Sequence, residues 1–327
     1  MPTRVGFVSA AHLHIWSYHH AFTRAEGIEM VGIFDSDAER GNAFAAKTGL
    51  PAFESLELLL ENVDAVIIAS ENRHHAAHIS AAARANKHFI CEKPIATTRV
   101  EITQIESALQ GFEKVGMTAF PCRFAPAYQS LKKKVQAGNI GQIRGATTTN
   151  RGTCPFSWFT QPDLSGGGAM IDHVVHVTDL LLDLFGSPVE SVQAQIGNQM
   201  YQQEWDDTAM VTLNFANGVF ASLDSSWTRL PSYKTWGDVT MTLVGDKGVL
   251  ELDLFGHDLD IYRAGEPSHS VIGVGSDFDA LLIQEFLDAI RDGKRPTVTV
   301  QDGLRASEVA IAAYESVRSG QVAKIAA

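Results

Sequence analysis

Several features that would place a chain in a membrane or outside the cell are missing from this 327-residue sequence. No stretch approaches the roughly 20 apolar residues that a membrane-spanning helix needs. The first residues also lack the apolar segment and cleavage site of a secretory signal. Cysteine is scarce, and Cys91, Cys122 and Cys154 lie too far apart to suggest a disulfide framework. We therefore expect a cytoplasmic protein with reduced thiols and no membrane partner.

Basic residues are also few, with 26 Lys and Arg against 38 Asp and Glu, and the formal net charge is −12. Affinity for nucleic acid depends largely on lysine and arginine side chains that neutralise phosphates. Nucleic acid is therefore not an expected partner. The hydrophobic content of 45% is ordinary for a globular protein, and the length suits about two domains.

Strand and helix signals alternate over the first 120 residues or so. The strand-like runs are RVGFVS, EMVGIF, DAVIIAS, KHFICE and KVGMTAF, and helical patterns such as DAERGNAFAAKTG and HHAAHISAAARAN separate them. Apolar strands that alternate with amphipathic helices indicate βαβ units. The sequence therefore predicts an α/β fold with a doubly wound parallel sheet in a domain of residues 1–121.

The pattern changes after FPCRFAP, which ends the alternation. From about Ile140, strands follow one another, with hairpin signals at residues 217–218 (Asn-Gly) and 246–248 (Asp-Lys-Gly). Two helical patterns close the chain, at residues 277–293 and 302–320, and each ends at a glycine. We expect a second, α+β domain of residues 122–327 with a large, mainly antiparallel open sheet.

The turn after the first predicted strand contains no glycine. A dinucleotide-binding turn reads G-x-G-x-x-G, because glycine permits the tight turn and the close approach of the backbone to the pyrophosphate. Here Ser9, Ala11 and His14 stand at the three glycine positions. Since Ala11 adds one methyl group and a helix N-terminus still offers N–H groups, we expect residues 9–13 to hold a pyrophosphate. The residues are Ser9, Ala10, Ala11, His12 and Leu13.

Two further residues follow predicted strands. Asp35 ends the second strand, where an acidic residue binds the ribose hydroxyls and repels a 2′-phosphate. No Lys or Arg follows it immediately, so NAD is favoured over NADP, although Asp35 and Asp37 also suit a turn and a helix N-cap. Lys93 precedes a proline at the carboxyl end of a strand, where α/β sheets bind ligands. It either exchanges a proton with a substrate hydroxyl or is a surface lysine in a loop.

The stretch DLSGGGAMIDHVVHVTDLL carries a possible acid–base pair. Asp172 and His176 are four residues apart and share a helix face, whereas His173 points about 100° away. An Asp beside a His orients the imidazole and stabilises its protonated form. A surface carboxylate with a structural histidine is the alternative. Because Asp172 and His176 diverge from His173 on a regular helix, a metal site formed by the three residues is disfavoured and no metal is expected. His74 and His75 are expected on a helix surface or at a domain contact.

Together, the ordered motifs resemble the Gfo/Idh/MocA oxidoreductases, the family of glucose-fructose oxidoreductase and inositol 2-dehydrogenase. The resemblance covers the whole chain and rests on the opening strand-turn-helix, Asp35, ASENRHH, EKP, GGGAMIDHVVH and the final DGLRASEVAIAAYESVRSG. It implies that Lys93, Asp172 and His176 act at the nicotinamide. Two departures are the glycine-free turn and Val174, where many members have glycine.

The resemblance also implies roles for residues around these motifs. Ser70, Asn72, Glu92 and Lys93 would contact the cofactor, and the second domain would pair subunits into a homodimer or homotetramer. Candidates near the substrate are His14, Arg123, Arg151, Trp158 and His173. The aromatic face of Trp158 suits a sugar ring, and core packing explains a tryptophan equally well. For His12 and His14, two interpretations stay open. Either one of them contacts a phosphate or the substrate, or one packs inside the protein and the other is exposed to solvent.

The function implied is an NAD-dependent hydride transfer between a sugar, sugar derivative or polyol and the nicotinamide. Lys93 and His176 would handle the hydroxyl proton, and Asp172 would orient His176. Two alternatives stay open: an enzyme that cleaves glycosides with the help of tightly held NAD, and a non-catalytic regulator that binds nucleotide or sugar. The altered turn favours the regulator, and the presence of Lys93, Asp172 and His176 counts against it.

Overall fold

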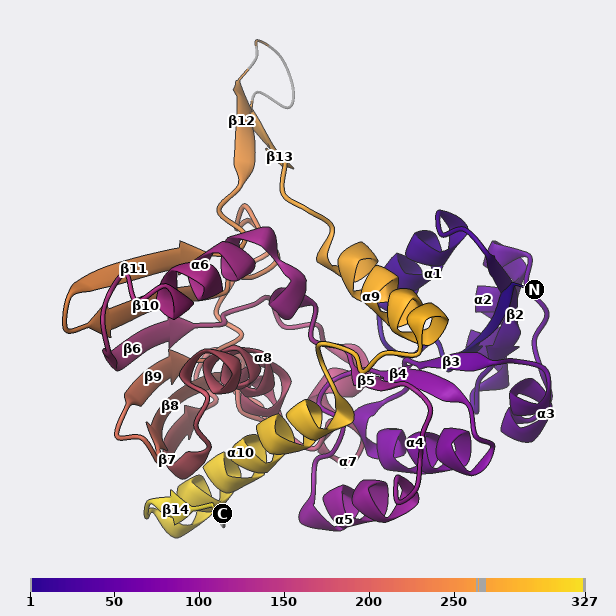
Figure 1. Ribbon diagram of the computed structural model, residues 1–327, viewed down its shortest axis with the longest axis horizontal. Coiled ribbons are helices and arrows are strands. Elements are labelled where there is room, and N and C mark those ends of the chain that lie inside the picture. Colours follow the sequence, from indigo (N-terminus) through magenta and orange to yellow (C-terminus); the bar gives the residue numbers. More distant parts are fainter. Residues whose placement is uncertain (1, 263, 265–268, 326–327) are drawn as a thin grey trace. The chain divides into compact units, whose positions relative to one another are not determined.

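The computed structural model describes residues 2–262, 264 and 269–325. They form two compact units, which are described separately (Figure 1). Unit 1 comprises Met1–Pro121, Ser157–Gly166 and Asp279–Glu308, and unit 2 comprises Cys122–Phe156, Gly167–Phe278 and Val309–Ala327. The first break lies between Pro121 and Cys122. Two later segments of the chain also belong to unit 1. A single boundary along the sequence therefore does not separate the two units.

Unit 1 is built on a five-stranded sheet with the order β2-β1-β3-β4-β5, in which all neighbours are parallel. The strands are β1 (Thr3–Val8), β2 (Ile28–Phe34), β3 (Ala65–Ile68), β4 (His88–Cys91) and β5 (Gly116–Thr118). All four residues of β3 are buried, as expected for a strand with covered faces. The predicted doubly wound α/β fold is confirmed.

Helices connect these strands, and several of them begin at polar caps that the sequence provides. The connecting helices are α1 (Ile15–Thr23), α2 (Ala38–Thr48), α3 (Leu56–Glu61), α4 (His75–Arg84) and α5 (Arg99–Ala108). The helices α7 (Pro162–Ser165) and α9 (Phe278–Asp292) come later in the chain. The carboxylate of Asp37 accepts hydrogen bonds from two N–H groups in the first turn of α2, and Thr98 and Glu101 form a capping box at α5. Short 3-10 helices span Asn72–His74, Pro121–Phe124 and Ser157–Thr160.

Unit 2 contains a seven-stranded sheet with the order β11-β10-β6-β9-β8-β7-β14. Its strands are β6 (Ile143–Thr149), β7 (Val189–Gly197), β8 (Thr208–Phe215), β9 (Phe220–Asp224), β10 (Thr240–Gly245), β11 (Gly248–Asp253) and β14 (Ala323–Lys324). Every neighbouring pair is antiparallel except β6 and β9. The predicted second domain with a mainly antiparallel sheet is therefore confirmed. A separate hairpin consists of β12 (Asp258–Tyr262) and β13 (His269–Gly273).

Turn and helix-end signals lie where the sequence predicts them. Gly218, with φ of +83°, follows Asn217 in the turn between β8 and β9. Residues 246–247 join β10 to β11, since Gly245 pairs with Gly248. The remaining helices are α6 (Pro126–Gln136), α8 (Ala169–Phe185) and α10 (Val300–Ser319). The left-handed Gly293 and Gly320 follow α9 and α10.

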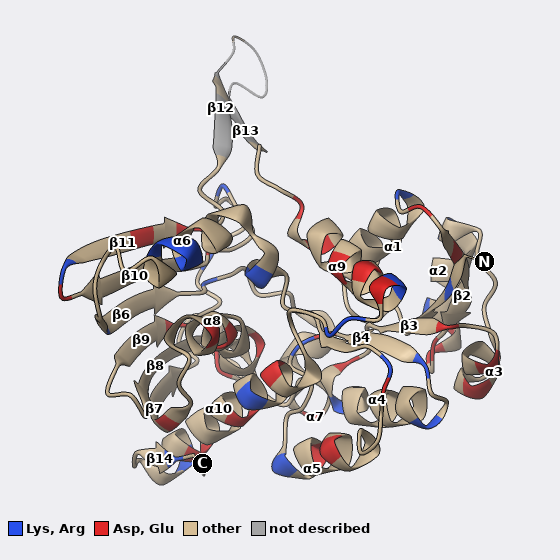
Figure 2. Ribbon diagram, viewed as in Figure 1, with Lys and Arg blue, Asp and Glu red and all other residues tan. Residues whose placement is uncertain are grey.

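Acidic and basic side chains are interspersed over the helices of both units (Figure 2). Residues 132–134 of α6 are three consecutive lysines. Among the residues that the structure describes, none of the helices combines the length and apolarity needed to cross a membrane.

Candidate functional site

The turn after β1 keeps a strand-turn-helix form without glycine. Ser9 has φ of 67°, a left-handed conformation that glycine adopts without steric cost. Its N–H donates to the carbonyl oxygen of Phe34 at 2.6 Å. Its hydroxyl lies 3.1 Å from Oδ2 of Asp35 and accepts a hydrogen bond from the N–H of Ala11 at 3.2 Å. Hydrogen bonds of the serine side chain therefore stabilise a turn that is usually built from glycine.

Other backbone donors of this turn are used within the protein. The Ala10 N–H donates to Oδ2 of Asp35 at 2.8 Å, and the His12 N–H donates to the carbonyl oxygen of Ala69 at 2.9 Å. The Leu13 side chain is exposed, at 47%. A phosphate bound here would have to share or replace the Ala10 and His12 hydrogen bonds.

Asp35, at the end of β2, binds an arginine that sequence reasoning missed. Arg40, in the first turn of α2, donates from Nε to Oδ2 of Asp35 and from Nη2 to Oδ1, both at 2.7 Å. A third donor, Nη1, binds the buried Glu71 at 2.8 Å. Burial alone would raise the pKa of Asp35, but hydrogen bonds from Arg40 and from two backbone N–H groups hold it below its usual value. The carboxylate is therefore ionised and oriented, and it lies beside the turn.

The segment after β3 is anchored by His75. Its Nε2 lies 3.0 Å from the carbonyl oxygen of Ser70, and its Nδ1 lies 2.8 Å from that of Pro94. Contrary to the expectation of a surface or domain-contact residue, His75 is fully buried, because it links the ends of two adjacent parallel strands. Asn72 is also buried, and its amide donates to the carbonyl oxygen of Ser165 at 2.8 Å.

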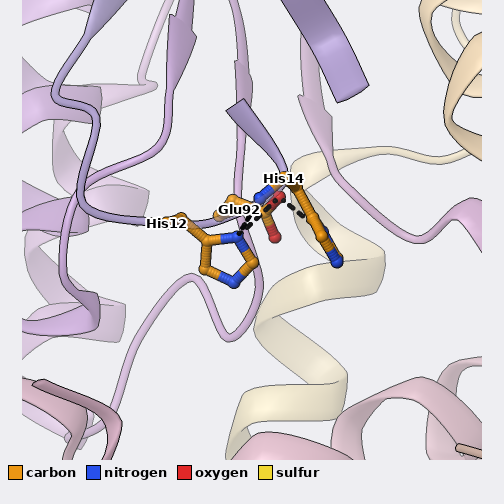
Figure 3. A group of neighbouring side chains, drawn as sticks. All are labelled: His12, His14 and Glu92. Atoms are coloured by element: carbon orange, nitrogen blue, oxygen red, sulfur yellow. Dashed lines mark hydrogen bonds and ion pairs between the residues drawn. The ribbon is translucent and has the colours of Figure 1, made fainter. Parts of the chain in front are cut away.

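Glu92 follows β4 and binds the turn after β1. Its Oε1 lies 3.1 Å from Nδ1 of His14 and 3.4 Å from Nδ1 of His12 (Figure 3). The Tyr18 hydroxyl donates to the same oxygen. Burial alone would raise the pKa of Glu92, but the charges of His12 and His14, the hydrogen bond from His14 and the charge of Lys93 hold it well below the usual value. Burial opposes protonation of His14, but Glu92 raises its pKa above the usual value.

Lys93 is buried, with 4% of its surface exposed, which excludes the alternative of a surface loop lysine. Its peptide bond to Pro94 is cis, and its backbone N–H lies 3.2 Å from Oε2 of Glu92. The residue stands at the carboxyl edge of the parallel sheet, the same edge that carries Ser9 and Asp35. This edge is where open α/β sheets bind their ligands.

Trp158 packs against the turn after β1. Its indole N–H donates to the carbonyl oxygen of Ala11 at 3.0 Å, and its ring stacks on Phe159 at a centroid distance of 3.9 Å. Only 5% of the tryptophan is exposed. These contacts support the packing interpretation of Trp158, one of the two that the sequence leaves open.

In unit 2, Gly168 allows a close approach of Asp206 to the start of α8. The Asp206 carboxylate accepts hydrogen bonds from the N–H groups of Gly168 and Met170 at 3.0 and 2.8 Å. A Cβ atom on Gly168 would lie 2.1 Å from the Asp206 carbonyl oxygen, and one on Gly167 would lie 2.1 Å from the Tyr314 hydroxyl. Burial raises the pKa of Asp206, although these hydrogen bonds oppose the rise. The glycine run therefore serves the packing of the helix that carries Asp172 and His176.

Asp172 and His176 lie one turn apart on α8. Oδ2 of Asp172 accepts a hydrogen bond from the Trp227 indole at 3.1 Å and lies 3.2 Å from Nε2 of His173. His173 is fully buried beside the rings of Trp227 and Trp236. The expected divergence of Asp172 and His173 is therefore not observed, since the histidine ring reaches back to its neighbour. His176 is partly exposed.

Arg123 and Arg151 both bind carboxylates of unit 2. Arg123 is buried and forms a bidentate pair with Asp179 at 2.7 and 2.9 Å, and its Nη1 lies 2.9 Å from Asp183. Arg151 is paired with Asp238 at 2.9 Å. The contacts of Arg123 hold α8 in place.

Comparison with known proteins decides the family. Residues 5–120 match the oxidoreductase family with an NAD-binding Rossmann fold, and residues 128–251 match the GFO/IDH/MocA C-terminal domain. The chain belongs to the Gfo/Idh/MocA oxidoreductase family. It is 27% identical over 329 residues to inositol 2-dehydrogenase 2 of Paenarthrobacter aurescens (strain TC1), which covers 98% of this chain and 97% of that relative.

Further relatives of this Gfo/Idh/MocA protein carry the names of dehydrogenases. The scyllo-inositol 2-dehydrogenase (NAD(+)) of Bacillus subtilis (strain 168) is 27% identical over 323 residues, which cover 93% of this chain and 91% of that one. A solved structure of levoglucosan dehydrogenase in complex with NADH and levoglucosan has the same fold, with a TM-score of 0.85, 22% identity and full coverage of both chains. The chain is accordingly an oxidoreductase of the dehydrogenase and reductase class with an NAD-binding Rossmann domain.

The residues at the sheet edge of this Gfo/Idh/MocA protein fit a dinucleotide. Ser9 adopts a left-handed φ in this tight turn, and Asp35 presents an ionised carboxylate beside it. The α1 helix begins at Ile15 without a side-chain cap, and its first N–H groups, those of Ile15 and Trp16, donate to the carbonyl oxygens of His12 and Leu13. A phosphate would therefore meet the helix dipole, and it would share these donors with the turn.

Proposed function

We propose that this Gfo/Idh/MocA protein is an NAD-dependent oxidoreductase that acts on a carbinol carbon of a sugar, sugar derivative or polyol. The observation that carries the proposal is the junction at the edge of the parallel sheet. There the segment after β4, with Glu92 and the buried Lys93, binds the turn after β1 through His14. A lysine beside a bound nicotinamide can exchange a proton with a substrate hydroxyl.

The cofactor would be held by residues after four of the strands. Residues 9–13 would meet the pyrophosphate and Asp35 the ribose hydroxyls, with Ser70, Asn72 and Glu92 nearby. NAD is proposed over NADP because the Asp35 carboxylate is ionised and buried against the turn, where it would repel a 2′-phosphate. When bound, the nicotinamide supplies the acceptor or donor of the hydride.

Proton transfer is assigned to Lys93 and His176. Lys93 would polarise or deprotonate the substrate hydroxyl, and the partly exposed His176 would carry the proton to or from solvent. Asp172 would act as a positioning residue for His176 from one helical turn away. These roles rest on the order of the motifs in the chain and on the burial of Lys93.

We further assign residues 1–121 to cofactor binding and residues 122–327 to substrate and subunit contacts, with a homodimer or homotetramer as the assembly. Exposed apolar side chains on one face of the seven-stranded sheet support the proposal of a homo-oligomer. Met210 on β8, Phe220 on β9 and Val244 on β10 are 55%, 58% and 45% exposed. The strand pairing places all three on the same face of the sheet, and several large apolar side chains exposed on one face are typical of a surface that a second subunit covers.

The test is a spectrophotometric assay of the purified full chain with NAD and a panel of inositols, other polyols, free sugars and glycosides. We expect NADH formation with at least one compound, and loss of that activity in Lys93→Met and His176→Asn. Lys133→Met, at an exposed lysine of α6, is the matched control and should retain activity. Absence of NADH from every compound would refute the proposal, and release of an aglycone without net NADH would assign glycoside cleavage instead.

One observation favours a regulator as the second candidate. The N–H groups of Ala10 and His12 are hydrogen bonded within the protein, so a pyrophosphate would gain less from this turn than from one with open donors. A regulator would bind a nucleotide or sugar without turnover. Fluorescence titration with NADH separates the candidates, because weak or absent NADH binding, with no turnover of the whole panel, is expected only of the regulator.

A further inference from the structure

Two histidines and a glutamate from distant parts of the chain converge in unit 1 (Figure 3). His12 and His14 belong to the turn after β1, and Glu92 follows β4. Each offers one ligand atom, and these atoms all lie within 4.8 Å of one another. We propose that His12, His14 and Glu92 bind a divalent transition-metal ion, with Zn²⁺ as the best match.

The distances fit the first coordination shell of such an ion. Oε1 of Glu92 lies 3.1 Å from Nδ1 of His14 and 3.4 Å from Nδ1 of His12. In a tetrahedral zinc site with ligand bonds of about 2.0 to 2.1 Å, neighbouring ligand atoms are about 3.3 Å apart. These two distances match that spacing, and the ligand atoms of His12 and His14 lie within 4.8 Å of each other. Rotation of the histidine side chains to the same spacing would place an ion at bonding distance from all three atoms.

The surroundings orient the ligands as a metal site requires. The hydroxyl of Tyr18 donates to Oε1 of Glu92, and the backbone N–H of Lys93 lies 3.2 Å from Oε2. The His12 ring packs against Phe159 at a centroid distance of 5.3 Å. Such outer contacts fix the ligand side chains before the ion arrives. The site therefore combines oriented ligands with an apolar wall.

The choice of ion follows from the donor atoms. Two imidazole nitrogens and one carboxylate oxygen form the donor set of several catalytic zinc sites, and soft thiolate ligands are absent from this set. Ca²⁺ and Mg²⁺ prefer sites made only of oxygen. Since His12 and Glu92 are buried and the His14 side chain is 24% exposed, water or a hydroxyl oxygen of a ligand would reach the ion from the side of His14.

The inference goes beyond the proposed function and does not depend on it, since metal binding is measured without turnover. The full chain is purified without an affinity tag, and its metal content is determined by elemental analysis. The chelator-treated protein is then titrated with Zn²⁺ by calorimetry and with Co²⁺ by visible absorption, which reports the coordination geometry. We expect one equivalent of Zn²⁺ per chain and intense Co²⁺ bands typical of tetrahedral coordination.

Variants connect the ion to these residues. His14→Ala and the isosteric Glu92→Gln should each weaken Zn²⁺ binding by more than about 100-fold, since even outer-shell changes cost about 10- to 100-fold. His20→Ala, at an exposed histidine of α1, is the control and should bind as the parent does. Thermal unfolding of each metal-free variant establishes that it is folded. Failure of the folded parent to bind Zn²⁺, or equal binding by His14→Ala and the parent, would show that the three residues are a hydrogen-bonded cluster only.

Discussion

The pairing of Asp35 with Arg40 predicts how the cofactor preference can be changed. In Asp35→Asn, the side chain keeps its shape and one acceptor oxygen, but it loses the charge that would repel a 2′-phosphate. The substitution also breaks the bidentate pair between Arg40 and Asp35, in which both donor–acceptor distances are 2.7 Å. The Arg40 guanidinium is then available to a phosphate at the position that Asp35 now guards. We expect binding to shift toward NADP.

The size of the shift follows from the charges. Two unit charges of the same sign that are 4 Å apart at an effective dielectric constant of about 20 repel by about 4 kcal/mol. Arg40 cancels part of this repulsion in the parent. We therefore expect Asp35→Asn to improve the binding free energy of NADPH relative to NADH by at least about 1.4 kcal/mol. That value corresponds to a change of about tenfold in the ratio of dissociation constants for NADPH and NADH.

The assay is a fluorescence titration of the purified protein with each reduced cofactor, which needs no substrate. The double variant Asp35→Asn with Arg40→Gln is the matched control, because it removes the cation that should receive the phosphate. We expect it to lose most of the gain in NADPH affinity. An unchanged NADPH-to-NADH ratio in Asp35→Asn would refute the assignment of Asp35 to the ribose.

Three other predictions concern stability and assembly. Because the pKa of Asp35 is lowered by folding, its stabilising contribution is complete above the unfolded pKa of about 3.9. Urea unfolding should show the parent's advantage over Asp35→Asn shrinking as the pH falls below that value, and a difference that does not vary with pH would contradict this. Gly168→Ala should lower the free energy of unfolding by about 3 kcal/mol, because the new Cβ would lie 2.1 Å from a backbone oxygen. A loss of less than about 0.5 kcal/mol in urea unfolding would contradict this and show that the start of α8 adapts to the methyl group. Phe220→Glu should convert the assembly to monomers, as measured by light scattering. Val100→Glu, at an exposed position of α5, is the control and should leave the assembly intact. An unchanged molecular mass of the Phe220→Glu protein would place the subunit interface elsewhere.

The strands, hairpin turns and helix ends could be predicted because each depends on residues close together in the chain. The run AVII is a buried strand, Asn217 and Gly218 form a turn, and Gly293 follows a helix, as their local patterns indicate. The strand-turn-helix without glycine was also predictable from its place after the first strand. Local sequence therefore accounts for most of the fold.

The contacts that shape the site were harder to predict from the sequence, because they join residues far apart in the chain. Nothing around Arg40 indicates that its side chain spans Asp35 and Glu71, and nothing near Asp206 indicates that it meets Gly168. His75 resembled a surface residue of a helix because its partners are backbone carbonyls of two separate loops. Such partners can be identified only once the strands are arranged in a sheet.

The same limit applies to the convergence of His12, His14 and Glu92. The spacing of the two histidines is visible in the sequence, but their third partner follows another strand. Sequence reasoning led us to expect no metal ion, since it considered only clusters within one helix. The order of the strands in the sheet brings the three residues together.

The central claim is that the chain oxidises or reduces a sugar or polyol with NAD through the buried Lys93. The most direct measurement is the rate of NADH formation by the parent, Lys93→Met and Lys133→Met on one substrate from the panel. We predict NADH formation by the parent and by Lys133→Met, and a rate at least about 100-fold lower for Lys93→Met. NADH formation by Lys93→Met at the rate of the parent would contradict the account.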